Sequence, residues 1–409
     1  MKHSDDVTHL AECAACRQRF AANVVTFDAG VRRSREREFT ATASRLERER
    51  DASTDVVARY LRDTPVEEWP RLAEMAELRN NAALEQMSEE VRRRLERNNL
   101  EALAVANVAT SIAESLHPNT YPSVVLAQLR ATAWRDRANA LRYLARYDEA
   151  FQSIDRAEFI LNQFATLAHD RAMVLLVKGM TLAQTGGFDR AHMTLSESRQ
   201  IFREHNDIRR FQQAGLAEAN ALYEGAQYEH ARHIYADLLR EATADLELQA
   251  RIHNNLGYCA TQLGDYVQAN IHFSEAVAKF TDLGFTAEVP RTERGAGLVL
   301  IARGQTASGL ARLRNARDAF AAAGMTEEAA LCALNIAAVL VERGEVAEAR
   351  SLMQNVADEF AAAGLAEHAI AAVVRLRDAI DMDDATAETV RTVHALIEGL
   401  RDRIHPTAN

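Results

Sequence analysis

The stretch GDYVQANIHFSEA, residues 264–276, contains a pattern of residues that recurs along the chain at a nearly constant spacing, so other segments can be aligned to it. The positions equivalent to its Ala269, which we call anchors, are Ala150, Ala191, Ala231, Gly309 and Ala349. Successive anchors are 41, 40, 38, 40 and 40 residues apart. Such a period indicates a repeat protein, in which one short structural unit is stacked many times.

Four further positions of each unit tend to keep their residue type. Small residues stand five positions before the anchor: Ala145, Gly186, Ala226, Gly264, Gly304 and Gly344. Others stand twelve before it: Ala138, Gly179, Ala219, Gly257, Gly297 and Ala337. Large apolar residues stand four after it: Ile154, Leu195, Tyr235, Phe273, Leu313 and Met353. Three before it, the first four units have an aromatic residue, namely Tyr147, Phe188, Tyr228 and Tyr266. The last two units have Thr306 and Val346 there instead.

This pattern predicts a hairpin of two antiparallel helices. The small residues at the anchor and twelve before it let the helices approach closely, and the Gly or Ala five before the anchor ends the first helix in a tight turn. We expect the aromatic residue to fill the hinge between the helices. We expect the large residue after the anchor to fill the seam with the next hairpin. One hairpin cannot bury its apolar face alone, so neighbours stack.

The segment LGYCATQLGDYVQANIHFSEAV, residues 256–277, resembles the tetratricopeptide repeat (TPR), and the resemblance covers roughly residues 125–370. It implies an all-α fold: a right-handed superhelical solenoid of TPR-like helical hairpins with an N-terminal helical extension. The expected domains, in chain order, are a His/Cys segment in 1–30, a charged helical linker in 31–81, a degenerate helical hairpin in 82–122, six repeats in 123–384, and a capping helix with a tail in 385–409.

Composition and charge narrow the class of protein. Hydrophobic residues make up 48% of the 409 residues, whereas there are only 17 Gly and 6 Pro, which favours long helices over sheets with many turns. No apolar run is long enough to span a bilayer, and the polar, acidic start does not look like a signal peptide. The net charge of −11 argues against direct nucleic-acid binding through phosphates. We therefore expect a cytoplasmic protein.

The stretch VTHLAECAACRQRF, residues 7–20, has the spacing of a metal site. On a helix, His9, Cys13 and Cys16 stand at i, i+4 and i+7 and point from one face. Imidazole and thiolate are ligands that Zn²⁺ prefers in tetrahedral sites. Three ligands do not close that shell, and His3 is the only upstream candidate for a fourth. The sequence thus predicts zinc as a cofactor, with an incomplete ligand set.

Residues 9–20 also resemble the zinc-binding anti-sigma factor domain of bacteria, whose His-x3-Cys-x2-Cys pattern is matched here. That family usually takes its fourth ligand from a helix well upstream, but only eight residues precede His9. Three explanations stay open. The segment is truncated because the true start lies upstream; His3, water or a second chain completes the shell; or the site has decayed and its helix only docks on its neighbours.

Motifs that carry enzyme chemistry are missing from the sequence. It contains no Gly-rich loop ending in Lys-Ser or Lys-Thr, no His-Glu-x-x-His and no Gly-x-Ser-x-Gly, so we expect a non-enzymatic protein. An anti-sigma-like segment followed by an array with lines such as ALAVANVATSIAESL (102–116) and FAAAGLAEHAIAAVVRLRDA (360–379) resembles bacterial regulatory adaptors.

The groove of the expected superhelix is lined by the first helices of the hairpins, and polar residues cluster there. The candidate binding residues are Arg135, Asn139, Asn220, Arg251, Asn254, Asn255 and Asn335. An Asn amide can donate to a peptide C=O and accept from its N–H, and Arg can pair with a carboxylate. TPR domains that clamp peptides resemble this arrangement. The alternative is that these Asn side chains cap helices or bond neighbouring hairpins.

Three functions therefore remain. The main hypothesis is a non-enzymatic adaptor in bacterial transcriptional or signalling regulation that binds a protein or peptide in its groove, with a link to sigma-factor control. The alternative is a peptide-sensing TPR receptor that changes conformation when its groove is filled. The third is a plain assembly scaffold, in which no metal binds.

Overall fold

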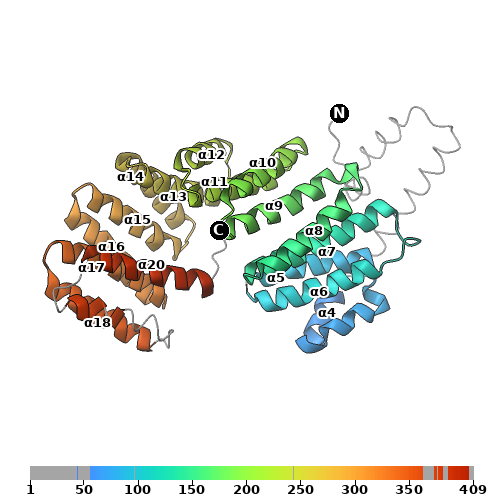
Figure 1. Ribbon diagram of the computed structural model, residues 1–409, viewed down its shortest axis with the longest axis horizontal. Coiled ribbons are helices and arrows are strands. Elements are labelled where there is room, and N and C mark those ends of the chain that lie inside the picture. The colour runs from blue at the N-terminus through green and yellow to red at the C-terminus, as the bar shows by residue number, and fades with distance from the viewer. Residues whose placement is uncertain are drawn as a thin grey trace. The chain divides into compact units, whose positions relative to one another are not determined.

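The computed structural model describes Ser44 and residues 56–95, 97–242, 244–362, 373–374, 376–380 and 386–404. Every regular element within these ranges is a helix. The chain divides into two compact units, Met1–Gly225 and Ala226–Asn409, which we call unit 1 and unit 2 and describe separately (Figure 1).

The described part of unit 1 begins with short helices and continues with longer ones. Its elements are α4 (Val56–Asp63), the 3₁₀-helices η1 (Val66–Glu74) and η2 (Ala76–Leu78), α5 (Asn81–Leu95), α6 (Asn99–Ser115), α7 (Ser123–Tyr143), α8 (Tyr147–Leu161), the 3₁₀-helix η3 (Ala165–Leu167), α9 (Ala168–Gln184), α10 (Phe188–Glu204) and α11 (Ile208–Glu224). The described elements of unit 2 are α12 (Tyr228–Glu241), α13 (Leu246–Gln262), α14 (Tyr266–Asp282), α15 (Glu288–Ala302), α16 (Thr306–Ala322), α17 (Thr326–Glu342), α18 (Val346–Ala362) and α20 (Ala387–Ile404).

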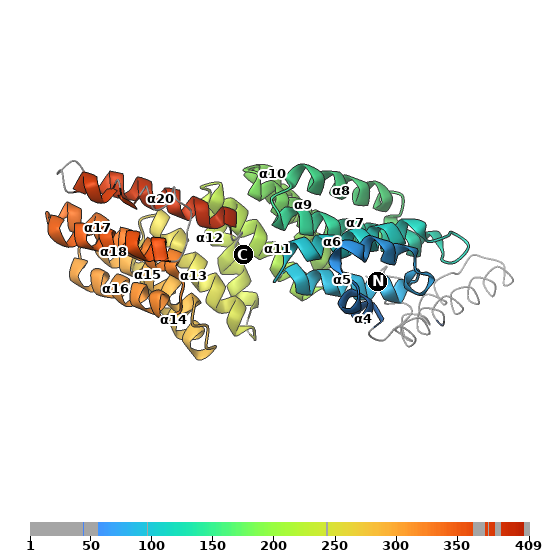
Figure 2. The ribbon, with the colours of Figure 1, turned by 90° about the horizontal axis from the view of Figure 1, so that it is seen from below.

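Helices that follow one another in the chain pack as hairpins. In unit 1, α5 packs with α6, α7 with α8 and α9 with α10 (Figure 2). In unit 2, α13 packs with α14, α15 with α16 and α17 with α18, and α20 covers α17. The expected all-α stack of helical hairpins is confirmed. The hairpin expected around Ala231 is divided by the unit boundary, because its two helices are α11 and α12.

The turn inside each repeat has the predicted geometry. All six small residues five before the anchor have a positive φ, between 54° at Ala145 and 79° at Gly186. The residue three before the anchor is the first residue of the second helix in every repeat, from Tyr147 of α8 to Val346 of α18. The left-handed residue therefore reverses the chain, and the second helix starts two residues later.

Two of these turns use alanine where glycine is the better residue. Ala145 and Ala226 have φ values of 54° and 57°, and a Cβ in this region costs about 1–2 kcal/mol. Ala145→Gly or Ala226→Gly should therefore raise the free energy of unfolding by roughly 0.5–1 kcal/mol, after the greater backbone entropy of glycine is subtracted. Urea unfolding of the full chain measures this change. The matched control, Ala311→Gly at an exposed position inside α16, should lower stability by about 1 kcal/mol; a shift of the same sign in all three variants would contradict the turn argument.

Glycines let the two helices of a hairpin touch. A Cβ added to Gly179 would lie 2.4 Å from Leu195 Cγ, and one added to Gly257 would lie 2.7 Å from the Phe273 ring. The large residue four after the anchor thus packs against the small residue twelve before it, inside its own hairpin. The expected seam contact also exists, because the Phe273 ring lies 2.9 Å from the Cβ position of Gly295 in α15. The sequence prediction was right but incomplete.

Of the expected charged helical linker over residues 31–81, the structure describes Ser44 and residues 56–81. Residues 56–80 form α4, η1 and η2, which pack on the first hairpin and bury Val57, Leu61, Trp69 and Leu72. Trp69 also donates its Nε1 proton to the Thr64 carbonyl at 2.9 Å. The charged residues of this segment lie at the surface, and its few apolar residues enter the core. The high charge of the segment therefore gave no indication that these apolar residues are buried. The hairpin expected in 82–122 corresponds to α5 and α6.

Within the described part of the chain, none of the helices combines the length and hydropathy that crossing a lipid bilayer requires.

Candidate functional site

The first helices of the hairpins form one side of each stack. In unit 1, α5, α7, α9 and α11 contact one another in that order, and α13, α15 and α17 do so in unit 2. The second helices of successive hairpins make fewer such contacts. A stack that is tighter on one side curves toward that side. The first helices therefore form what we call the inner wall of each unit.

Polar bonds join the neighbouring first helices along both inner walls. In unit 1 they are Ser88 Oγ to Asp136 Oδ2 at 2.5 Å, Gln128 Nε2 to Asp170 Oδ1 at 3.2 Å, and His169 Nε2 with Asp207 Oδ2 at 2.9 Å. In unit 2 they are Thr292 Oγ1 to Asn254 Oδ1 at 3.1 Å and Arg291 Nη2 to Glu328 Oε1 at 3.1 Å. Each bond links residues about one repeat apart, so the polar groups of the wall hold the spacing between hairpins.

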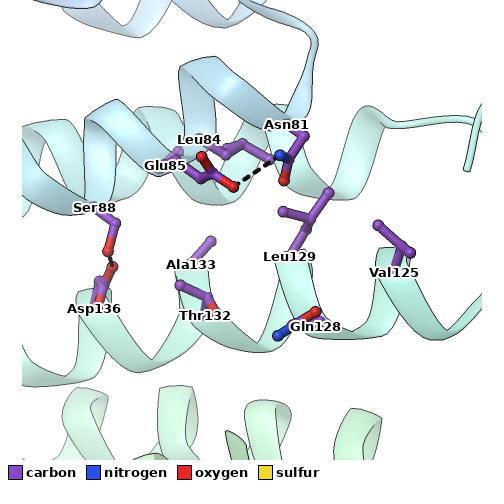
Figure 3. A pocket seen from close by; sticks show the side chains of 11 residues that line it. Asn81, Leu84, Glu85, Ser88, Val125, Gln128, Leu129, Thr132, Ala133 and Asp136 are labelled. Atoms are coloured by element: carbon purple, nitrogen blue, oxygen red, sulfur yellow. Dashed lines mark hydrogen bonds between the residues drawn. The ribbon is translucent and has the colours of Figure 1, made fainter. Parts of the chain in front are cut away.

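A cavity of about 220 Å³ opens between α5 and α7 on the inner wall of unit 1 (Figure 3). Its lining from α5 is Asn81, Leu84, Glu85 and Ser88, and its lining from α7 is Val125, Gln128, Leu129, Thr132, Ala133 and Asp136. Ala109 of α6 also lines it. Because α6 is the second helix of the first hairpin, Ala109 forms the floor and the open side belongs to the inner wall. We call this cavity the α5–α7 pocket.

The two ends of the pocket are held by bonds to carboxylates. Ser88 on α5 donates to Asp136 on α7, and the neighbouring Arg135 also donates to Asp136, with Nη2 at 2.6 Å from Oδ1. Asn81 Nδ2 donates to Glu85 Oε1 at 2.9 Å, one helical turn along α5 (Figure 3). The pocket is therefore acidic in character, although Arg135 offsets part of the Asp136 charge from outside the lining.

Arginine side chains lie next to the pocket on the same wall. Arg210 of α11 has a lowered pKa, first because burial removes it from water and then because Arg135 lies near, whereas the Asp207 carboxylate acts in the opposite direction. Asp207 also caps α11 by accepting from the Arg210 backbone N–H at 3.0 Å. The inner wall of unit 1 therefore presents both an acidic cavity and a basic edge.

The structure divides the seven predicted groove residues between the two units. In unit 1, Arg135 is paired with Asp136 and its side chain is 16% exposed. Asn139, one turn further along α7, accepts two bonds from the Arg142 guanidinium, at 3.1 and 3.0 Å. Asn220 lies half-buried on α11. Of these three, Arg135 comes nearest to the pocket, because its neighbour Asp136 lines it.

In unit 2 two predicted groove residues serve contacts between helices. Asn254 accepts from Thr292 of α15, and Asn255 Nδ2 donates to the Tyr235 hydroxyl of α12 at 3.3 Å. These bonds are those of the alternative interpretation, in which Asn joins neighbouring hairpins. The remaining two residues are Arg251, which pairs with Glu247 one turn earlier at 3.0 Å, and Asn335, whose Nδ2 is buried in α17 without a hydrogen-bond partner among the described residues.

Reading the sequence missed all of the residues that line the α5–α7 pocket. The signal for them is a polar stripe: Asn81, Glu85 and Ser88 stand at i, i+4 and i+7 on α5, and Gln128, Thr132 and Asp136 at i, i+4 and i+8 on α7. Such spacing places each set on one helix face, beside the apolar face that enters the core. The stripe in α5 belongs to the hairpin that was predicted to be degenerate. The repeat pattern does not extend to this hairpin, so the positions of the stripe could not be assigned from the anchors.

Chemical sites are not evident among the described residues. No group of three or more His, Cys, Asp or Glu side chains there is arranged to hold a metal ion. Burial raises the pKa of the Cys259 thiol to about 12 and that of Cys332 to about 11, so both are poor nucleophiles and fill the core as expected. The predicted zinc ligands His3, His9, Cys13 and Cys16 lie outside the described residues, and zinc binding stays a prediction.

Neither a protein-family model nor a curated protein matches the chain. Solved structures do. The apo form of the quorum sensor NprR from B. thuringiensis is 14% identical, with 82% of this chain and 99% of that chain covered and a TM-score of 0.52. A signal transduction ATPase (STAND) protein with a tetratricopeptide repeat sensor from Pyrococcus horikoshii is 11% identical, with 88% of this chain and 54% of that chain covered and a TM-score of 0.57.

The fold is that of TPR-type helical repeat proteins. At these identities the likeness concerns the fold alone. A third structure, of NprR with its cognate peptide NprX, is 15% identical, with 78% of this chain and 88% of that chain covered and a TM-score of 0.39. The TPR hairpins of this chain thus place their first helices on an inner wall, and the site on that wall has to be argued from its own residues.

Proposed function

We propose that this chain is a non-enzymatic TPR receptor that binds a peptide on the inner wall of unit 1. The α5–α7 pocket is the observation that carries the proposal. It combines five apolar with six polar side chains, and ligand sites join apolar walls to placed polar groups in this way. Arg135, which pairs with Asp136 of the lining, adds a positive charge beside the pocket.

A peptide fits this wall better than a compact small molecule does. Pockets that enclose a whole small ligand usually measure about 300–1,000 Å³. The α5–α7 pocket measures about 220 Å³, which suits one side chain of a longer ligand that continues along the wall. The residues that form the polar bonds between first helices place carboxylates, amides and hydroxyls along the path that such a longer ligand would take.

The comparison with NprR supports the same proposal. NprR is a quorum sensor with a cognate peptide, and its fold is shared by this chain. This support favours the peptide-sensing alternative over an adaptor linked to sigma-factor control. The sigma-factor link depends on the resemblance of the His9, Cys13 and Cys16 segment, which lies outside the described residues, so it stays a prediction. We further propose that a bound peptide alters the spacing of α5, α7 and α9. The peptide would lie across the polar bonds that join these neighbouring helices.

The test is a selection of random nine-residue peptides by display on the full chain, followed by fluorescence polarisation with the selected peptides. Thr132→Trp fills the α5–α7 pocket from α7 and should weaken binding at least tenfold, as loss of a central contact does. Hydrogen exchange of α5, α7 and α9 with and without peptide measures the conformational response. Circular dichroism and thermal unfolding check that the variant is folded.

Gln200→Trp is the matched control, because Gln200 is exposed on α10, a second helix. It should leave peptide affinity unchanged. Equal affinity of the two tryptophan variants would place binding away from the pocket. A selection that yields no peptide with micromolar affinity would contradict the receptor proposal as a whole.

A further inference from the structure

The α5–α7 pocket has a chemical preference that can be read from its lining. Its apolar lining side chains are Leu84, Ala109, Val125, Leu129 and Ala133. All five are at least nine-tenths buried. A side chain that enters the pocket must therefore have a hydrocarbon portion that covers this surface, and the long methylene stems of Lys and Arg do so readily.

The charges of the lining have one sign. Glu85 on α5 and Asp136 on α7 face the cavity from its two walls, and no lysine, arginine or histidine is among the residues that line it (Figure 3). The two bonds that Arg135 makes to Asp136 meet one oxygen, Oδ1, while Oδ2 accepts from Ser88. A carboxylate has about four acceptor positions, so Asp136 retains capacity for a further donor.

The neutral polar groups of the lining reinforce this preference. Asn81 directs its Nδ2 to Glu85, Ser88 directs its hydroxyl proton to Asp136, and Gln128 directs its Nε2 to Asp170 at the next helix. Each of the three uses a donor on a carboxylate. The two amides then point their carbonyl oxygens away from that carboxylate, and the Ser88 oxygen keeps its lone pairs as acceptors. An incoming anion would therefore meet few donors, whereas an incoming cation would meet acceptors and negative charge.

We infer that the α5–α7 pocket binds a positively charged nitrogen at the end of an apolar stem, as in an arginine or lysine side chain of the bound peptide. This inference rests on the proposed function and names the ligand class of the same site. Two sources of such a nitrogen exist in a peptide, a basic side chain and the N-terminal amine. The amine has no stem of its own, so the apolar walls favour the side chain.

The experiment uses peptides that are acetylated at the N-terminus and amidated at the C-terminus. Peptides from the selection are compared with versions in which one Arg is replaced by citrulline, its neutral analogue of nearly the same shape. We expect the full chain to bind the arginine version at least tenfold more tightly, as charge-assisted hydrogen bonds do. Glu85→Gln should reduce this preference to less than about threefold, because it removes a charge and keeps the shape of the side chain. A free N-terminus that restores the affinity of citrulline peptides would assign the nitrogen to the terminal amine instead.

Glu197→Gln is the protein control, since Glu197 is an exposed carboxylate on α10. It should leave the preference for arginine intact. Selected peptides without enrichment in Arg or Lys, or with equal affinity after citrulline replacement, would overturn the inference and leave the receptor proposal standing.

A second probe keeps the inference testable if no peptide is selected. N-acetyl-arginine amide, titrated into the full chain and followed by NMR, should bind at millimolar concentrations and lose this binding in Glu85→Gln. The citrulline analogue should not bind. Binding that survives in Glu85→Gln, or no binding at all, would contradict a cation pocket whatever the outcome with peptides.

Discussion

Phe273→Ala is expected to lower the free energy of unfolding by about 3–5 kcal/mol. The Phe273 ring is completely buried in α14 and touches the glycines of two first helices, Gly257 in α13 and Gly295 in α15. Its loss therefore opens a cavity at the point where two hairpins meet, and the glycines offer no side chain that could fill it. Urea unfolding followed by circular dichroism measures the loss, and hydrogen exchange locates it in α13 to α15.

Phe159→Ala is the matched control, because Phe159 is a phenylalanine of α8 that is 62% exposed. It should change stability by less than about 0.5 kcal/mol. Gly257→Val completes a double-mutant cycle. It should be strongly destabilising alone, since its Cβ would lie 2.7 Å from the ring, and much less so when combined with Phe273→Ala. Additive effects of the two substitutions would show that the contact between ring and glycine does not determine the packing.

Arg199→Met is expected to destabilise unit 1 toward the lower end of about 3–5 kcal/mol. Glu218 of α11 is 1% exposed and lies between two groups of α10, with Arg199 Nε at 3.0 Å and His192 Nδ1 at 3.1 Å. Methionine keeps much of the side-chain volume and removes the charge, which leaves the buried carboxylate with only His192 and the Ser196 hydroxyl as partners. The lower end applies because Arg199 is one-fifth exposed and His192 remains.

The Arg199→Met variant should also depend on pH in a characteristic direction. Burial raises the pKa of Glu218 above its ordinary value of 4.5, and Arg199 and His192 oppose this rise. Without Arg199 the pKa rises further, so the folded variant binds a proton more tightly than the unfolded chain. Its stability relative to the native chain is then best below about pH 4.5 and falls as the pH rises through the folded pKa. Urea midpoints measured from pH 4 to pH 7 check this.

The double variant Arg199→Met/Glu218→Met is the control for the charge argument. Replacing both members of a buried ion pair by apolar residues is often neutral or stabilising, so most of the lost stability should return. The fall in stability with rising pH that Glu218 causes in Arg199→Met should also disappear, because the double variant has no carboxyl group at position 218. If the double variant is as unstable as Arg199→Met, the loss comes from packing on Phe211, whose ring centre lies 5.8 Å from the Arg199 guanidinium carbon, and not from the charge.

The repeat pattern was sufficient to predict the hairpins, because the residues that define them act locally. A left-handed turn at Gly264 and the start of α14 at Tyr266 depend on residues only a few positions apart. The pattern did not reveal that Val57 to Leu78 join the first core, because their apolar residues are few and lie among charges. The anchor positions describe only the repeats, and this segment precedes the first repeat, so the pattern makes no prediction for it.

The candidate site was predicted only in outline. The sequence placed polar residues on first helices and singled out Arg135, whose neighbour Asp136 lines the pocket. It also suggested Asn254 and Asn255 as groove residues, but these bond Thr292 and Tyr235 of adjacent helices. A helix turns by about 100° per residue, so neighbours in the sequence face different surroundings, and an offset alone does not distinguish the groove from a contact between hairpins.

The sequence by itself determined that this protein is a stack of helical hairpins with a period near forty residues and left-handed turns at fixed positions. These features depend on backbone conformation and on the size of side chains within one repeat, which the order of residues specifies directly. Only the tertiary structure decided that α5 and α7 enclose an acidic pocket floored by α6. Residues on its opposite walls, such as Ser88 and Asp136, are 48 positions apart in the sequence, and they meet only after whole hairpins have packed.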